Sequence, residues 1–198
     1  MTKKEIFINA TFKDNAIWRQ ILGICSALAV TNLMLNSLIM GLGVIFTLAM
    51  AGMTISLIRA WTPRSVRMMV QVLIIAAYVI IVDIFLKANM PVISKQLGPY
   101  VGLIITNCIL MGRAEAFASQ NKVMDSLVDG IGSGIGYTMV LLLISFIREL
   151  FGFGSIFGFR IMGDWWTAWS IMVMAPSAFF ILAMLIWIIN TYYYKVKA

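Results

Sequence analysis

The chain of 198 residues has no histidine, only two cysteines and few charges. Without histidine there is no histidine-ligated haem, no serine–histidine triad and no histidine-based metal site. Cys25 and Cys108 are too few for a disulfide framework. Charged residues make up 12% of the chain, whereas a soluble domain has about a quarter. These absences exclude an ordinary soluble domain and a disulfide-stapled secreted one.

Hydrophobic residues make up 62% of the chain and gather in long runs without charge. A helix that spans a membrane needs roughly 20 apolar residues, and the first run, residues 20–58, is long enough for two. The net charge of +7 comes from basic residues between the runs, where they set topology rather than bind nucleic acid. The sequence therefore predicts an all-α membrane protein with six transmembrane helices, at Gln20–Val30, Leu38–Ile58, Met68–Leu86, Gly98–Met111, Asp129–Ile147 and Ser170–Ile189.

The first and fourth predicted helices are short for a full span. Thr31 and Asn32 end the first one, and Gly98, Pro99 and Gly102 interrupt the start of the fourth. Irregular backbone inside a membrane is tolerated only where protein or a cavity covers it. We therefore expect helices 1 and 4 to be short or broken and to line the functional centre.

The second and fifth predicted helices repeat one another. Residues 41–59 and 130–148 align without gaps and are identical at seven of nineteen positions, including a Gly-x-Gly start and a Ser-x-Ile-Arg end. A unit with an odd number of spans must insert its two copies in opposite orientations. We expect one integral membrane domain, 1–198, built as two inverted three-helix repeats of about 1–95 and 96–198.

Glycine occupies alternate positions at the start of the fifth predicted helix, from Gly130 to Gly136. The spacing lacks the G-x-G-x-x-G fingerprint and no βαβ unit surrounds it, so a dinucleotide-binding loop is not indicated. Small residues let two membrane helices approach closely. The glycines therefore predict tight helix packing.

The third predicted helix contains one acidic residue, Asp83. Acidic residues inside a membrane span are candidate ion sites. Lys87 follows one turn later, at the spacing of a helical ion pair. This favours an interfacial Asp83–Lys87 pair, with an ion site as the alternative.

Basic residues are distributed unevenly between the two sides of the membrane. If the N-terminus is cytoplasmic, eleven lie inside and four outside, which places both termini in the cytoplasm. The inner residues are Lys3, Lys4, Lys13, Arg19, Arg59, Arg64, Arg67, Arg113, Lys122, Lys195 and Lys197, and the outer ones are Lys87, Lys95, Arg148 and Arg160.

A cysteine in a membrane helix either packs as a small soft side chain or binds a metal as a thiolate. Cys25 lies six residues after Arg19, and Cys108 lies five residues before Arg113. Both arginines are assigned to the cytoplasmic side, so the two thiols are expected at similar depth on the first helix of each repeat. This symmetry favours a ligand pair.

Two thiolates are half of the ligand set of an iron–sulfur cluster. A [2Fe–2S] cluster normally takes four cysteines, and this chain has no histidine to replace them. The other two ligands must come from another chain, either a second copy or a similar subunit.

Several segments resemble the D-type membrane subunits of the bacterial sodium-translocating NADH:quinone oxidoreductase and, more distantly, the E-type subunit of the related Rnf ferredoxin:NAD complex. NCILMGRAEAFA (107–118) is the most specific of them. The sequence around Cys25 and before Cys108 is more similar to the quinone-reductase branch. The other matching segments are LGICSALAVTN (22–32), SLIRAWTPRSVRMMVQ (56–71), ISKQLGPYVGLIITNCILMGRAEAFA (93–118), SLVDGIGSGIGY (126–137) and APSAFF (175–180).

The resemblance implies a subunit of a six-subunit complex in the bacterial inner membrane. Its partner would be the paralogous E-type subunit of the same complex, inserted with opposite topology. Each would supply two cysteines to an intramembrane [2Fe–2S] cluster, here Cys25 and Cys108, that carries electrons across the membrane. No catalytic residue and no flavin, NADH or quinone site is expected on this chain.

Two other functions remain open at this point. An Rnf-type subunit would keep the cluster and change the electron donor and acceptor. A secondary ion transporter would fit the inverted repeat and leave the cysteines to packing. The transporter has little support, because Asp83 is the only intramembrane charge that the pattern indicates.

Overall fold

The protein is almost entirely helical in a computed structural model that describes residues 3–156, 159–160, 169, 172 and 174–191. A two-stranded antiparallel ribbon, β1 (Ser155–Ile156) with β2 (Phe159–Arg160), is the exception. The helical elements are α1 (Lys3–Ile8), the π-helical turn η1 (Asn9–Lys13), α2 (Ile24–Val30), α3 (Met34–Ile58), α4 (Arg67–Asn89), α5 (Pro91–Ile105), α6 (Cys108–Arg113), the π-helical turn η2 (Ala114–Ala118), α7 (Val123–Phe153) and α9 (Ala175–Ile189).

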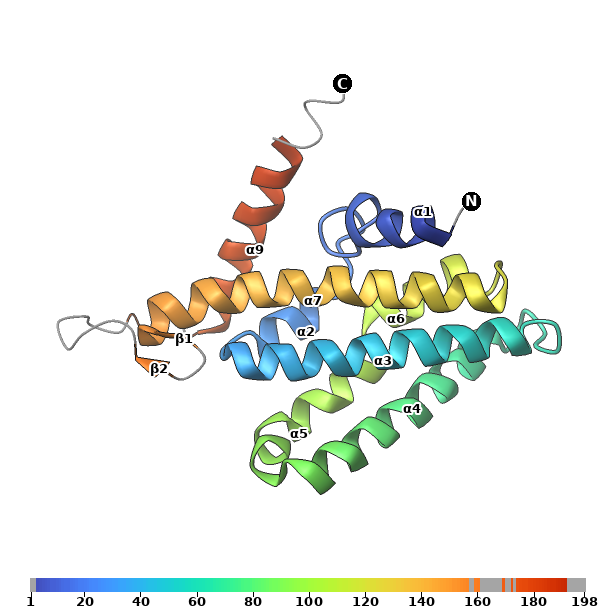
Figure 1. Ribbon diagram of the computed structural model, residues 1–198, viewed down its shortest axis with the longest axis horizontal. Helices are drawn as coiled ribbons and strands as arrows, with labels where there is room; N and C mark the ends of the chain where they lie inside the picture. The colour runs from blue at the N-terminus through green and yellow to red at the C-terminus, as the bar shows by residue number, and fades with distance from the viewer. Residues whose placement is uncertain (1–2, 157–158, 161–168, 170–171, 173, 192–198) are drawn as a thin grey trace.

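Two long antiparallel helices, α3 and α7, form the centre of the fold (Figure 1). Glycines let their backbones approach. A Cβ at Gly130 would lie 2.8 Å from the carbonyl oxygen of Leu48, and one at Gly134 would lie 2.8 Å from the Cα of Ile45. No larger residue fits at these two positions without moving the partner helix. The predicted close packing of the glycine-rich helix is confirmed.

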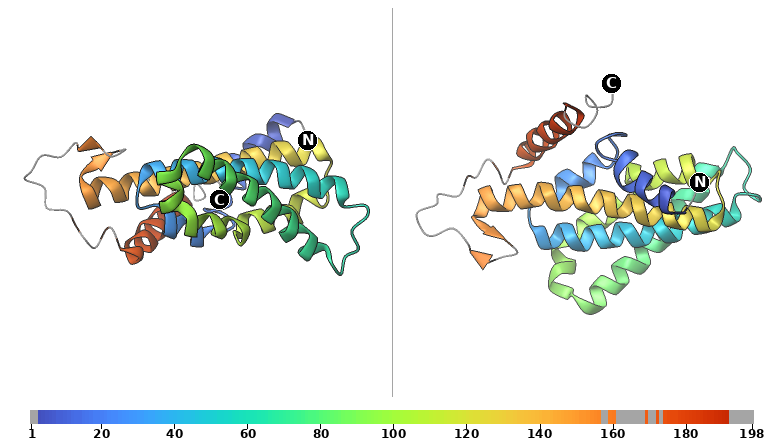
Figure 2. Two further views of the ribbon diagram at one scale, coloured as in Figure 1. Left: turned by 90° about the horizontal axis from the view of Figure 1, so that it is seen from below. Right: turned by 45° about the horizontal axis from the view of Figure 1, so that its top comes forward.

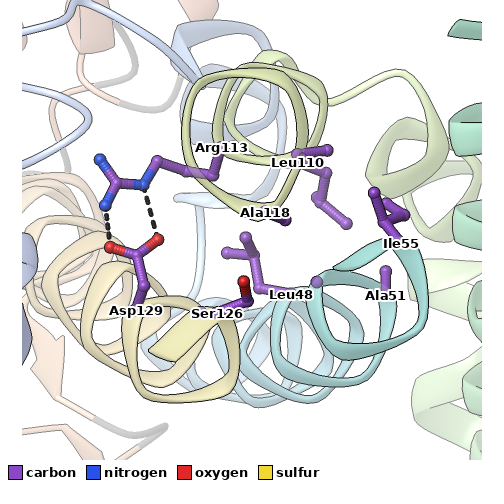
Figure 3. Close-up of a pocket in the computed structure, with 11 residues that line it drawn as sticks. Leu48, Ala51, Ile55, Leu110, Arg113, Ala118, Ser126 and Asp129 are labelled. Atoms are coloured by element: carbon purple, nitrogen blue, oxygen red, sulfur yellow. Dashed lines mark hydrogen bonds and ion pairs between the residues drawn. The ribbon is translucent and has the colours of Figure 1, made fainter. Parts of the chain in front are cut away.

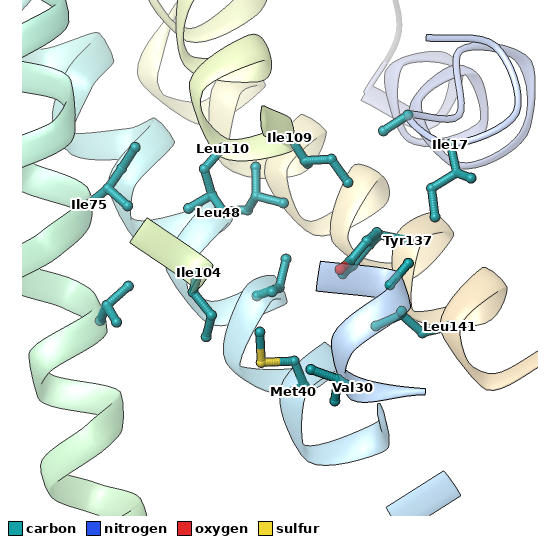
Figure 4. Close-up of a cluster of buried hydrophobic side chains, with 14 of the residues drawn as sticks. Ile17, Val30, Met40, Leu48, Ile75, Ile104, Ile109, Leu110, Tyr137 and Leu141 are labelled. Carbon is teal, nitrogen blue, oxygen red and sulfur yellow. The ribbon is translucent and has the colours of Figure 1, made fainter. Parts of the chain in front are cut away.

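The other elements pack around this pair. Helices α4 and α5 contact each other and α3, whereas α1 and η1 lie against α7. Helix α9 contacts α2 and α7 and extends away from the bundle (Figures 1 and 2). Buried aliphatic side chains from α2, α3, α6 and α7 form a continuous core, with Tyr137 of α7 among them (Figure 4).

The membrane class predicted from the hydropathy is confirmed. Among the described residues, four segments are long and apolar enough to cross a membrane: Met34–Ile58, Arg67–Asn89, Leu97–Ala118 and Val123–Phe153. A shorter apolar helix covers Pro176–Ile189.

Several helix ends differ from the sequence prediction. Helix α7 begins at Val123 and ends at Phe153, well outside the predicted Asp129–Ile147. Its polar ends pack against other elements, and hydropathy does not detect such turns. The polar N-terminal segment is also helical, in α1 and η1. Ile6 of α1 and Ala10 of η1 are buried.

Two arginines that the charge pattern places in loops are buried in the fold. Arg113 is 8% exposed and Arg148 is 2% exposed, because both find polar partners inside. The Asp83–Lys87 pair is present as predicted, with 2.6 Å between Lys87 Nζ and Asp83 Oδ2. Lys195 and Lys197, which the charge pattern assigns to the cytoplasm, lie outside the described residues.

The α3–α7 contact can be tested with Gly130→Ala. The new methyl group would meet backbone atoms of Leu48 and Ala49, so we expect the protein to lose about 1–3 kcal/mol of stability, as is typical of overpacking. Thermal unfolding in detergent measures the loss. Gly43→Ala is the matched control in α3, since its methyl group would lie at least 3.4 Å from its neighbours. Equal stability of the two variants would contradict the close contact.

Candidate functional site

The chain is irregular just before Cys25. Ile21 and Gly23 have positive φ angles of 55° and 81°, and α2 begins only at Ile24. A β-branched residue such as isoleucine is strained in this conformation, whereas glycine adopts it freely. A Cβ at Gly23 would also lie 2.7 Å from the side chain of Ile109. The first predicted helix is therefore a seven-residue helix after a break, with Cys25 in its first turn.

A second break lies just before Cys108. Helix α5 ends at Ile105, and α6 begins at Cys108 itself. Asn107 between them has an extended backbone, and its side chain accepts a hydrogen bond from the amide of Ile109 (3.2 Å). This is an N-cap, which satisfies one of the free amides at a helix start. The fourth predicted helix is thus interrupted, as expected, but the break lies at Thr106 and Asn107, whereas Gly98, Pro99 and Gly102 lie inside the continuous helix α5.

The two breaks meet. Asn107, directly before Cys108, donates from Nδ2 to Oγ of Ser26, directly after Cys25 (3.0 Å). Both cysteines are free thiols and both are exposed on the surface of the chain. Within the described residues, no group of three or more histidine, cysteine or acidic side chains could hold a metal ion. The part of the chain that the structure describes therefore presents two thiols from neighbouring elements, with no histidine, acidic side chain or further cysteine grouped with them.

Helix α7 anchors α6 through a buried ion pair. The guanidinium of Arg113, at the end of α6, donates two hydrogen bonds to the carboxylate of Asp129, and the Nε–Oδ2 distance is 3.0 Å (Figure 3). The two side chains are only 9% and 4% exposed. Such a paired, hydrogen-bonded geometry is what makes a charge tolerable in a low-dielectric interior.

The same helix anchors α2 and α3 at its other end. Arg148 donates to Thr31 Oγ1 (2.7 Å) and to the carbonyl oxygen of Leu28 (3.5 Å), which lie at the C-terminal end of α2. Glu149 accepts a hydrogen bond from the amide of Met34 at the start of α3 (2.7 Å). An arginine at a helix C-terminus and a carboxylate at a helix N-terminus both interact favourably with the helix dipole.

The sequence reasoning found the cysteines and missed these anchors. The charge pattern treats Arg113 and Arg148 as topology-setting charges at the ends of apolar runs, Asp129 as the first residue of the fifth predicted helix, and Glu149 as part of the loop that follows it. Asp83 is therefore not the only charged residue of the candidate spans, because Arg113, Asp129, Arg148 and Glu149 are buried there. The available signal was the rule that ionisable residues beside a span have a partner inside it.

These features can be compared with known proteins. A sequence profile described as "Rnf-Nqr subunit, membrane protein" matches residues 3–186. The chain belongs to the Rnf-Nqr subunit family.

Relatives within the Rnf-Nqr family are similar over nearly their whole length. The D subunit of the Na(+)-translocating NADH-quinone reductase of Psychromonas ingrahamii is 50% identical over 193 residues, which is 95% of this chain and 92% of the relative. The protein of the same name from Shewanella sp. (strain W3-18-1) is 49% identical over 96% of this chain and 92% of the relative. The one from Pseudomonas paraeruginosa is 46% identical over 96% of this chain and 88% of the relative.

The anchor at α6 can be tested by changing one or both of its charges. Asp129→Leu leaves the Arg113 guanidinium buried without its partner, and we expect a loss of about 3–5 kcal/mol. The double variant Arg113→Met/Asp129→Leu removes both charges and should regain most of that loss. Thermal unfolding of the purified protein in detergent gives both values. A double variant no more stable than Asp129→Leu would show that the pair is not the anchor.

Proposed function

We propose that this chain is a membrane subunit of a sodium-translocating NADH:quinone reductase, an enzyme complex that couples electron transfer to ion transport. The relatives that carry this name match the chain at 45–50% identity from end to end. The Rnf alternative is disfavoured, because the same relatives are named for the quinone reductase. The observation that carries the proposal within the fold is the pair of exposed thiols at two adjoining helix breaks.

The pair Cys25 and Cys108 is proposed as half of a [2Fe–2S] site. The donor set fits half of the cluster: two free thiols, on elements joined by the Asn107–Ser26 hydrogen bond, facing out of the chain where another chain can reach them. The remaining two thiolates are assigned to the paralogous E-type subunit. When bound, such a cluster accepts and releases one electron at a time.

The residues of this chain have a narrower task. Cys25 and Cys108 provide ligand atoms, and Asn107, Ser26 and the anchors of α7 hold the two short helices that carry them. No residue of this chain is assigned to catalysis, and NADH, flavin and quinone are assigned to other subunits of the complex.

The inverted repeat is part of the proposal, and the α3–α7 contact supports it. The sequence alignment pairs each residue of α3 with the residue 89 positions later in α7. Gly41 contacts Thr138 and Ala49 contacts Gly130, and the alignment exchanges these two contacts. Ile45 contacts Gly134, and the alignment maps this contact onto itself. Such a pattern is what a two-fold axis passing between Ile45 and Gly134 would produce.

The proposal includes six helices in the bacterial inner membrane with both termini in the cytoplasm. Removing the buried Arg113 and Arg148 from the charge count leaves ten basic residues on the proposed cytoplasmic side and three on the other. The bias is preserved, so the orientation does not depend on the two buried arginines.

The cysteines can be tested with Cys108→Ala in the assembled complex. If they only pack, the loss of one sulfur should cost about 1 kcal/mol and leave activity nearly intact. If they bind a cluster, NADH should still reduce the flavin that precedes it, and quinone reduction should stop. Stopped-flow kinetics of the two partial reactions separate these outcomes.

The double variant Cys25→Ala/Cys108→Ala is the control for this experiment. It should be no worse than either single variant, since ligands of one site act as a unit. Near-normal quinone reduction in an assembled Cys108→Ala complex would refute the ligand role.

The orientation can be tested by reporter fusions at Lys95 and Lys197. We expect a periplasmic signal at Lys95 and a cytoplasmic signal at Lys197. Alkaline phosphatase, which is active only outside, and a fluorescent protein that folds only inside read the two sides independently. A cytoplasmic signal at Lys95 would overturn both the topology and the equal depth of the thiols.

A further inference from the structure

Tyr137 of α7 lies at the junction of the two cysteine-bearing helices. Its side chain is fully buried, and its hydroxyl lies 2.5 Å from Oγ of Ser26. Ser26 is itself 2% exposed and Asn107 is 4% exposed. Figure 4 shows the Tyr137 ring among aliphatic side chains that include Ile109 and Leu141. A hydroxyl in such surroundings can form hydrogen bonds only with protein groups, and burying it without one would cost stability.

Ser26 takes part in three side-chain hydrogen bonds. Its hydroxyl lies 3.1 Å from the carbonyl oxygen of Gly23, which can only accept and which also accepts from the amide of Ala27. The Nδ2 group of Asn107 can only donate, and it donates to Ser26 Oγ (3.0 Å). In the bond between Tyr137 and Ser26, either hydroxyl has a proton to donate. Ser26 Oγ thus joins Gly23, Asn107 and Tyr137.

This network joins the caps of the two interrupted helices. Gly23 is the N-cap of α2, and Asn107 is the N-cap of α6. Ser26 follows Cys25 directly, and Asn107 precedes Cys108 directly. All residues of the network therefore lie within two positions of Cys25 or Cys108 in the sequence, except Tyr137, which belongs to α7.

We infer that Tyr137 is a positioning residue for the thiol pair: its hydroxyl fixes the α2 break against the α6 break and so sets the separation and orientation of Cys25 and Cys108. The inference rests on the proposed function for its cluster readouts. It assigns to α7 a residue that binds no cofactor and acts only through Ser26 and Asn107. Outer partners of this kind commonly contribute about 10–100-fold to metal affinity or activity.

The test uses Tyr137→Phe in the full complex, because phenylalanine keeps the ring and removes only the hydroxyl. We expect the electron paramagnetic resonance spectrum and the midpoint potential of the cluster to differ from those of the wild type. The variant should also lose its iron at a chelator concentration about tenfold lower than the wild type does. A second readout needs no cluster. In cluster-depleted complex, a bifunctional thiol reagent should join Cys25 to Cys108 within the chain, and Tyr137→Phe should reduce the yield severalfold.

Tyr78→Phe is the matched control. Tyr78 also hydrogen-bonds a hydroxyl on a neighbouring helix, Thr54 Oγ1 at 2.8 Å, but between α3 and α4, away from the cysteines. A general loss of helix packing would affect both variants, whereas positioning affects Tyr137→Phe alone. Ser26→Ala breaks the same network from the other side, so its effects should not add to those of Tyr137→Phe.

The inference is overturned if Tyr137→Phe matches Tyr78→Phe in spectrum, chelator sensitivity and bridging yield. It is also overturned if the wild-type thiols cannot be bridged. If Tyr137→Phe does not assemble, Ser26→Ala carries the test, and unchanged readouts there overturn it. Failure of the proposed function looks different: iron would remain in Cys108→Ala, while the bridging yield would still report on positioning.

Discussion

Breaking a helix inside a membrane leaves backbone amides and carbonyls that no water can satisfy. This membrane protein contains two helix breaks, before Cys25 and before Cys108, and several polar side chains bind backbone groups beside them. The Ala27 amide and the Ser26 hydroxyl both lie at the Gly23 carbonyl, Asn107 satisfies an amide at the start of α6, and Arg148 binds the Leu28 carbonyl at the other end of α2. The breaks have a consequence for chemistry, because they place two thiols at helix starts on the surface of the chain.

Helix α7 links these compensating groups over its whole length. Asp129 near its start binds Arg113 of α6, and Tyr137 near its middle binds Ser26 at the junction of the two breaks. Arg148 near its end binds Thr31 at the end of α2. The helix can do this because Gly130 and Gly134 let it lie directly against α3. Close backbone packing is the main source of helix association where lipid removes the hydrophobic driving force. The glycine packing against α3 and the polar anchors to α2 and α6 therefore both depend on the position of α7.

The sequence allowed the interrupted helices and the glycine packing to be predicted, because both depend on local pattern. Thr31 follows the last residue of α2 as expected, but the break of the fourth predicted helix comes at Thr106 and Asn107 and not at Pro99, which lies inside α5. The burial of Arg113 and Arg148 could not be predicted in this way. Their partners lie 16 residues away in Asp129 and 117 residues away in Thr31, and an arginine at the end of an apolar run has the same local pattern whether it faces water or a buried carboxylate. The ends of α7 were misplaced for a related reason, since Asp125 and Glu149 lower the hydropathy of turns that remain helical.

The proposed half-site is tested most directly by the iron and acid-labile sulfide content of this chain purified together with its paralogous partner and no other subunit. A shared [2Fe–2S] cluster requires two iron and two sulfide per pair of chains, and the pair should contain both in that ratio. A folded, stoichiometric pair that has neither iron nor sulfide after anaerobic purification would contradict the ligand role of Cys25 and Cys108 and return the two thiols to packing.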